Sequence, residues 1–121
     1  MVFSPPMPAS LLYHNPRCSK SRAALALLQE RGVEVEVVLY LKAPLDRKAL
    51  LGLGQQLGLP PREWIRDKEA AYREAGLSER SSDEELFEAM ALHPILMERP
   101  ILVRGRRAIV GRPPERVLDL L

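Results

Sequence analysis

The sequence predicts an α/β domain built on a mixed four-stranded sheet with a helical insertion. Strand and helix patterns alternate in the first third of the chain, helix signals alone fill the middle, and short β-branched runs return near the end. With 121 residues and 46% hydrophobic content, the chain is long enough to bury a core. We therefore expect a single domain over residues 9–121, preceded by a flexible Pro-rich leader at residues 1–8.

The N-terminal part predicts a right-handed parallel strand-helix-strand unit. An apolar strand is expected at about residues 9–13, and strong helix formers follow at 19–31, with Gly32 as the C-cap. Residues 33–40 then alternate as a strand does. The side chains expected on one face of this strand are Val33, Val35, Val37 and Leu39.

The helical insertion is expected at about residues 45–95. A turn leads into a helix at about residues 46–57, and shorter helices with an apolar inner edge are expected after it. Ser82 and Glu85 have the spacing of a capping box, so a further helix should begin there. His93 precedes a proline, which ends that helix.

The end of the chain predicts an antiparallel hairpin followed by a last helix. Two short apolar runs at residues 101–103 and 108–110 flank an Arg-Gly-Arg-Arg turn. Prolines then introduce a helix at about residues 114–121, whose apolar side chains would cover the sheet. Taken together, this order of elements is that of a thioredoxin-like fold with a helical insertion.

Cys18 is the only cysteine in the sequence, and its position favours a nucleophile. It falls where the first strand gives way to the first helix, so the thiol would face unpaired backbone N–H groups and the positive end of the helix dipole. Arg17, Lys20 and Arg22 add positive charge nearby. Lowering a thiol pKa of about 8.5 by about two units requires roughly 2.7 kcal/mol, which such surroundings can supply. The alternative is that Cys18 is a small buried hydrophobic residue.

The spacing around Cys18 argues against several other cysteine chemistries. His14, Cys18 and His93 form no paired metal-ligand pattern, so we expect no metal. A phosphatase-type loop would place an arginine where Ala24 stands. A dithiol oxidoreductase would place a second cysteine at the position of Ser21. The chain is therefore at most a monothiol enzyme that takes its second thiol from another molecule.

Composition limits the partners and the compartment. The formal charge of +2 is nearly balanced and argues against nucleic-acid binding through a massed basic face. The sequence has neither a membrane-spanning apolar run nor the apolar core of a signal peptide. One cysteine allows no internal disulfide. We expect a cytoplasmic monomer that binds neither nucleic acid nor membrane and holds no bound cofactor.

Three motifs resemble the glutaredoxin-coupled arsenate reductase family. They are Tyr-His-Asn-Pro-Arg-Cys-Ser-Lys-Ser-Arg at residues 13–22, Glu-Arg-Pro-Ile at 98–101 and Gly-Arg-Pro-Pro at 111–114. The resemblance runs in order over about residues 11–121. The Ser-Lys pair after the cysteine and the end of the sequence at Leu121 resemble the short, chromosomally encoded branch of the family.

The resemblance implies a set of site residues. Cys18 matches the family's nucleophile, and Pro100 falls where thioredoxin-like folds carry a cis-proline. The arginines that match oxyanion-binding residues are Arg66, Arg99 and Arg112. The residues that could tune the thiolate are His14 and Ser21, which match the family, and Arg22, which lies near the cysteine in sequence.

The resemblance also implies a reaction and its partners. The Cys18 thiolate would attack arsenate, glutathione would serve as a co-substrate, and a glutaredoxin would complete the reduction to arsenite. One alternative is a glutathione-linked thiol reaction on another substrate. Another is a regulator resembling the Spx proteins, which share this fold and bind RNA polymerase. Many of those sense oxidation through Cys-x-x-Cys, and Ser21 removes that pair.

Overall fold

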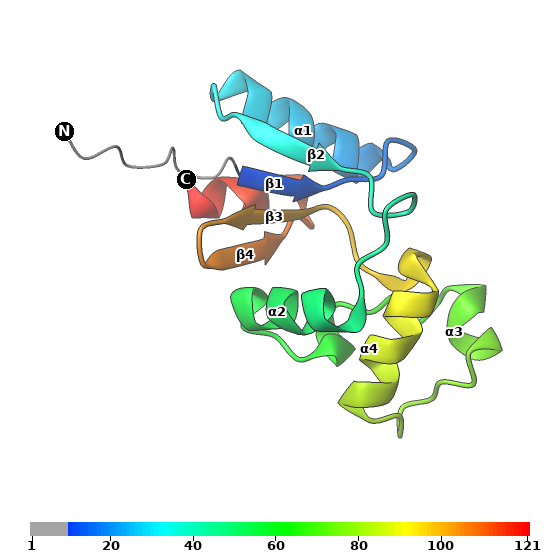
Figure 1. The fold of residues 1–121 in the computed structure, drawn as a ribbon. Coiled ribbons are helices and arrows are strands. Elements are labelled where there is room, and N and C mark those ends of the chain that lie inside the picture. Colours follow the sequence, from blue (N-terminus) through cyan, green and yellow to red (C-terminus); the bar gives the residue numbers. More distant parts are fainter. Residues whose placement is uncertain (1–9) are drawn as a thin grey trace.

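The computed structural model describes residues 10–121 and contains one mixed four-stranded sheet (Figure 1). Its strands are β1 (Ser10–Tyr13), β2 (Val35–Val38), β3 (Ile101–Arg104) and β4 (Arg107–Val110). The strand order is β2-β1-β3-β4, with β1 parallel to β2 and the other two pairings antiparallel. The predicted sheet and the predicted hairpin are both confirmed. The expected leader at residues 1–8 lies outside the described residues.

The strand register brings four chain segments to the same edge of the sheet. Tyr13 pairs with Val38 on the parallel strand β2 and with Ile101 on the antiparallel strand β3. Ile101 in turn pairs with Val110 at the end of β4. The loops after β1, β2 and β4 and the segment before β3 therefore meet there. This edge also receives Cys18, which follows β1.

Helix α1 (Ser19–Glu30) and the C-terminal 3-10 helix η3 (Pro114–Leu120) pack against the sheet and share a small core with it. The fully buried residues of this core come from α1, η3 and the two central strands: Leu12, Ala24, Leu28, Leu102 and Val117. The last helix thus lies where the sequence predicts it, in 3-10 form.

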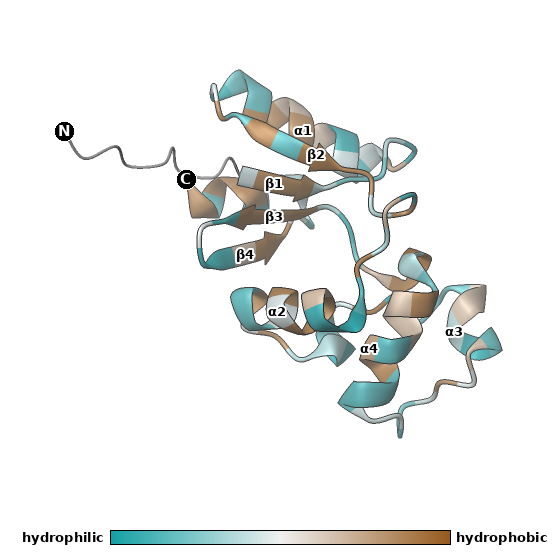
Figure 2. Ribbon diagram, viewed as in Figure 1, coloured by the Kyte–Doolittle hydropathy of each residue, from teal (hydrophilic) through white to brown (hydrophobic). Residues whose placement is uncertain are grey.

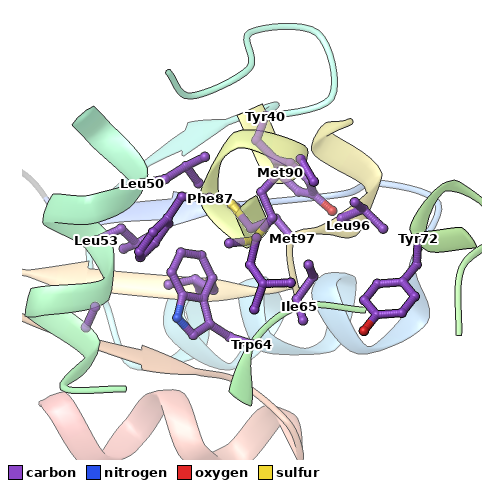
Figure 3. Packing of buried hydrophobic residues seen from close by; sticks show 14 of the residues in the cluster. Tyr40, Leu50, Leu53, Trp64, Ile65, Tyr72, Phe87, Met90, Leu96 and Met97 are labelled. Carbon is purple, nitrogen blue, oxygen red and sulfur yellow. The ribbon is translucent and has the colours of Figure 1, made fainter. Parts of the chain in front are cut away.

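The larger core is formed by the insertion between β2 and β3 together with residues of β3 and β4 (Figure 3). The insertion contains α2 (Arg47–Leu57), η1 (Pro61–Glu63), α3 (Ala70–Glu74), α4 (Asp83–Leu92) and η2 (Pro94–Leu96). Figure 2 shows mostly apolar residues along β1 and β3, whereas α2, α3 and α4 mix apolar and hydrophilic residues. Helices of this kind bury one side and leave the other to solvent.

A short backbone pairing ties the insertion to the sheet edge. Ile65 forms an isolated antiparallel bridge with Met97. The backbone N–H of Arg66 donates to the carbonyl of Leu96 at 2.7 Å. This pairing aligns Arg66 with the segment that carries Glu98 and leads into β3. The insertion therefore folds back onto the edge where Cys18 lies.

The predicted start and end of α4 are confirmed, whereas the C-cap of α1 is Arg31 and not Gly32. The Ser82 hydroxyl accepts from the Glu85 backbone N–H at 3.2 Å, and the Glu85 carboxylate accepts from the Ser82 N–H at 3.0 Å. His93 is the C-cap of α4. Gly32 lies one residue beyond the C-cap of α1 with φ 67°, a conformation that favours glycine.

The second strand is shorter than predicted. The strand spans only Val35–Val38, not residues 33–40. Val33 and Val35 pack on the smaller core, whereas Val37 is 40% exposed. The reason is that β2 is an edge strand with a neighbour on one side only, so its side chains are less covered.

Candidate active site

Cys18 is the N-cap residue of α1, as its place in the sequence predicts. Its backbone is extended, with φ −94° and ψ 121°, and its N–H donates to the carbonyl of Asn15 at 3.0 Å. The residue is partly exposed. No acidic residue lies in the first turn of α1, so the free N–H groups of that turn and the helix dipole act on the thiol without a competing negative charge.

The pKa of the Cys18 thiol is lowered from its ordinary value. Burial is the largest influence and raises the pKa, but three groups together outweigh it. These are the backbone N–H of Ser21, the guanidinium of Arg99 and the backbone N–H of Lys20. The cation that favours the thiolate thus comes from a distant part of the chain. Arg22 donates to the Pro16 carbonyl at 2.8 Å.

His14 and Ser21 form a buried pair on either side of Cys18 in the sequence. The His14 Nδ1 atom lies 2.6 Å from the Ser21 Oγ, which also accepts from the backbone N–H of Asn15 at 3.1 Å. Burial, followed by the charge of Arg22, lowers the pKa of His14 and favours the neutral imidazole. With its proton on Nε2, His14 accepts the Ser21 hydroxyl proton. With its proton on Nδ1, it leaves that hydroxyl proton free to point elsewhere.

Arg99 reaches the thiol from the segment that precedes β3. The Arg99–Pro100 peptide bond is cis, at the place that the sequence resemblance implies. The guanidinium of Arg99 lies near the Cys18 thiol and lowers its pKa. Its Nε and Nη1 atoms are buried and have no hydrogen-bond partner among residues 10–121. Such donors are costly to leave unpaired, so they are suited to an acceptor from outside the chain.

Arg112 is held against the same segment by close packing. Gly111 donates its N–H to the Pro100 carbonyl at 2.8 Å, and a Cβ at Gly111 would lie only 2.9 Å from the Pro100 Cγ. Only glycine permits this approach. The Nη1 atom of Arg112 then donates to the Arg99 carbonyl at 3.1 Å. Arg99 and Arg112 therefore lie side by side.

Arg66 reaches this edge as well, but its guanidinium is already paired. Its Nε donates to the Glu69 Oε1 at 3.0 Å and its Nη1 to the Glu98 Oε1 at 2.9 Å. Burial lowers the pKa of Arg66, but the hydrogen bonds and charges of the two glutamates raise it overall. The Nε of Arg112 lies 3.7 Å from the same Glu98 oxygen. Glu98 thus joins Arg66 to Arg112.

An open pocket of about 400 Å³ is formed beside these side chains. Its lining residues are Ile65, Arg66, Asp67, Lys68, Glu69, Glu98 and Arg112. Cys18 and Arg99 lie outside this lining. The structure thus brings together all three predicted arginines and the cysteine. Arg99 is the arginine that lowers the pKa of the thiol, and Glu98 lies between Arg66 and Arg112.

Comparison with known proteins shows the family of the chain. A match to the ArsC family covers residues 13–120. The chain belongs to the ArsC family. It is 53% identical over 112 residues to the uncharacterized protein YfgD of Escherichia coli K12, covering 91% of this chain and 94% of that protein. It is 48% identical over 117 residues to an arsenate reductase of Neisseria meningitidis serogroup B, covering 95% of this chain and 100% of that protein.

The ArsC-family fold extends to solved structures. The arsenate reductase from Vibrio cholerae matches with a TM-score of 0.90 and 48% sequence identity, over 95% of this chain and 98% of that one. The thioredoxin-like architecture with its helical insertion is therefore that of an arsenate reductase structure.

Two residues of this ArsC-family site were missed by the sequence reasoning. Glu98 is the first residue of the Glu-Arg-Pro-Ile motif, but nothing in the sequence shows that it joins two arginines. Tyr40 is fully buried after β2, and its hydroxyl has no partner among residues 10–121. Burial raises the pKa of Tyr40 to about 12, while Arg99 and Arg66 lower it and Cys18 and Glu98 raise it. Tyr40 follows the parallel strand β2, and this position in the sequence could have placed it at the same edge of the sheet as Cys18.

Within residues 10–121, no group of three or more His, Cys, Asp or Glu side chains converges as metal ligands would. None of the helices in this part of the chain is long and apolar enough to cross a membrane.

Proposed function

We propose that this protein is an arsenate reductase in which the Cys18 thiolate attacks arsenic. The observation that carries the proposal is a cysteine at a helix N-terminus whose thiol pKa is lowered by the nearby Arg99, together with the Nε and Nη1 of Arg99, which are buried without a partner among residues 10–121. Thiolate and free guanidinium donors together provide a nucleophile and a site for an oxyanion. The names of the relatives from N. meningitidis and V. cholerae support arsenate as the oxyanion.

In the first step, arsenate binds against Arg99 and Arg112, with Arg66 completing the positive side of the pocket. The Cys18 sulfur attacks arsenic, forming a sulfur–arsenic bond. One arsenate oxygen takes up protons and leaves as water. The guanidinium groups offset the negative charge of the anion, which would otherwise repel the thiolate.

In the second step, glutathione supplies the thiol that this chain lacks. Its sulfur attacks the arsenic adduct and displaces a second oxygen as water. A glutaredoxin thiolate then attacks the glutathione sulfur, the bond between that sulfur and arsenic breaks, and its electron pair reduces arsenic. Water releases arsenite and regenerates Cys18. The sequence supports an outside thiol because Cys18 is its only cysteine.

The test is arsenite production from arsenate with glutathione, glutaredoxin and a system that regenerates the reductant. We expect turnover by the wild type and none by Cys18→Ser, which removes only the nucleophilic sulfur. No turnover by folded wild type with Cys18 reduced would refute the activity. Full turnover without glutathione and glutaredoxin would refute only the proposed electron donors.

A second candidate is a glutathione-linked thiol reaction on another substrate. It is supported by Glu98, whose carboxylate already lies between Arg66 and Arg112 and reduces the positive charge open to arsenate. The same assay separates the two candidates. Wild-type protein whose Cys18 attacks glutathione disulfide, forming a protein–glutathione mixed disulfide and releasing one glutathione, yet leaves arsenate unchanged, would favour the second.

A further inference from the structure

Glu98 places one carboxylate oxygen between two guanidinium groups. Its Oε1 lies 2.9 Å from the Arg66 Nη1 and 3.7 Å from the Arg112 Nε. The three side chains are partly buried, with 23%, 21% and 29% of their surfaces exposed for Glu98, Arg66 and Arg112. The backbone N–H of Glu98 donates to the Trp64 carbonyl at 3.0 Å, which fixes where the side chain starts. A carboxylate oxygen thus lies where an oxyanion would meet both arginines.

The pocket therefore contains negative charge before any substrate arrives. Glu69 and Glu98 both pair with Arg66, so the two carboxylates offset two of the three guanidinium charges at this edge. Arg99 differs, because its Nε and Nη1 have no partner among residues 10–121. An anion that uses Arg66 or Arg112 must share them with Glu98 or displace it.

We propose that Glu98 competes with tetrahedral oxyanions for Arg66 and Arg112 and so lowers the affinity of the site for them. This inference rests on the proposed function. Phosphate has the shape and charge of arsenate, so anything that strengthens binding of one anion strengthens the other. A thiolate turns over arsenate but not phosphate, so tight binding of phosphate would only block the site.

The competition has a kinetic consequence. Glu98 repels the bound anion before and during the attack of Cys18, so it weakens ground state and transition state alike. Such a uniform effect raises KM while leaving kcat nearly unchanged. Glu98 thereby lowers occupation of the site by arsenate and phosphate alike, without slowing the chemical step on bound arsenate.

The test is Glu98→Gln, which keeps the shape of the side chain and removes its charge. We expect the KM for arsenate and the inhibition constant of phosphate each to fall about tenfold, with kcat changed little, because a like charge next to the anion is removed. Glu69→Gln is the matched control. This variant removes a carboxylate from the same Arg66. Unlike Glu98, Glu69 forms no ion pair with Arg112 in the described part of the chain, so we expect a smaller change.

Binding measured without chemistry separates this inference from the proposed function. In the Cys18→Ser background, calorimetry should show tighter binding of inorganic phosphate when Glu98→Gln is added. Unchanged or weaker binding would overturn the role of Glu98 even if the wild type reduces arsenate. Tighter binding with no wild-type turnover would leave the role of Glu98 standing and refute the reductase. Glu98→Asn, a second neutral variant, serves the same test if Glu98→Gln does not fold.

Discussion

Arg66 and Arg99 reach the same edge of the sheet in opposite states. Arg66 comes from the insertion and is paired with Glu69 and Glu98. Arg99 comes from the segment before β3, lowers the pKa of the Cys18 thiol and has two buried nitrogen atoms, Nε and Nη1, without a hydrogen-bond partner among residues 10–121. The difference separates two roles: a paired guanidinium holds the pocket together, whereas an unpaired one is ready for the thiolate and an incoming anion.

The comparison predicts that Arg99→Lys has the largest effect on activity. Lysine keeps the charge but loses the planar set of donors that can serve sulfur and oxyanion together. We expect kcat/KM for arsenate to fall about 100-fold, as is typical when a donor to the reacting group is lost. Arg104→Lys, an exposed arginine at the far end of β3, is the matched control and should change little. Equal activity of Arg99→Lys and wild type would contradict the assignment.

The same comparison can be sharpened through the Cys18 thiol. Arg99 favours the thiolate, so Arg99→Gln should raise the pKa of Cys18, whereas Arg66 is not among the groups that shift it. A raised pKa lowers the thiolate fraction at neutral pH. We expect the alkylation rate of Cys18 by iodoacetamide, followed against pH, to shift to higher pH in Arg99→Gln only. A similar shift in Arg66→Gln would show that the two arginines act alike on the thiol.

Stability should respond in the reverse order. Arg66→Gln removes the partner of Glu69 and Glu98 and leaves two partly buried carboxylates beside each other. We expect the free energy of unfolding to fall by about 1–2 kcal/mol, a value reduced from that of a fully buried pair because the side chains are partly exposed. Urea denaturation measures this change. If Arg66→Gln lost less free energy of unfolding than Arg99→Gln, the structural role assigned to Arg66 would be contradicted.

Local signals in the sequence were enough to predict the helix start at Cys18, whereas the cation that lowers the pKa of its thiol, Arg99, comes from a distant segment. The position of Cys18 at a helix start follows from an apolar strand and strong helix formers on either side of it. The capping box of Ser82 and Glu85 depends on residues three apart in sequence. Patterns of this kind depend only on residues close in sequence, so they predict local structure without knowledge of the whole fold.

The pocket could not be predicted in the same way, because it depends on pairings between distant segments. Arg66 reaches the edge through the bridge between Ile65 and Met97, 32 residues apart. No short motif encodes that register. The position of Glu98 between two arginines follows from the same pairing, and therefore appears only in the structure.

Two buried tyrosines give the smallest predicted effect. Tyr40 and Tyr72 both belong to the larger core (Figure 3), but the Tyr72 hydroxyl accepts from the Arg62 Nη1 at 2.6 Å, whereas the Tyr40 hydroxyl has no partner among residues 10–121. Tyr72→Phe should therefore lower the free energy of unfolding by about 1 kcal/mol, while Tyr40→Phe should leave it unchanged or raise it slightly, because removing an unpaired buried hydroxyl avoids its desolvation cost. Thermal and urea denaturation of the two variants, side by side, measure the difference. If Tyr40→Phe loses as much stability as Tyr72→Phe, the Tyr40 hydroxyl has a hydrogen-bond partner in the folded protein, and Arg99, whose charge lowers the pKa of Tyr40, is the first residue to test for that contact.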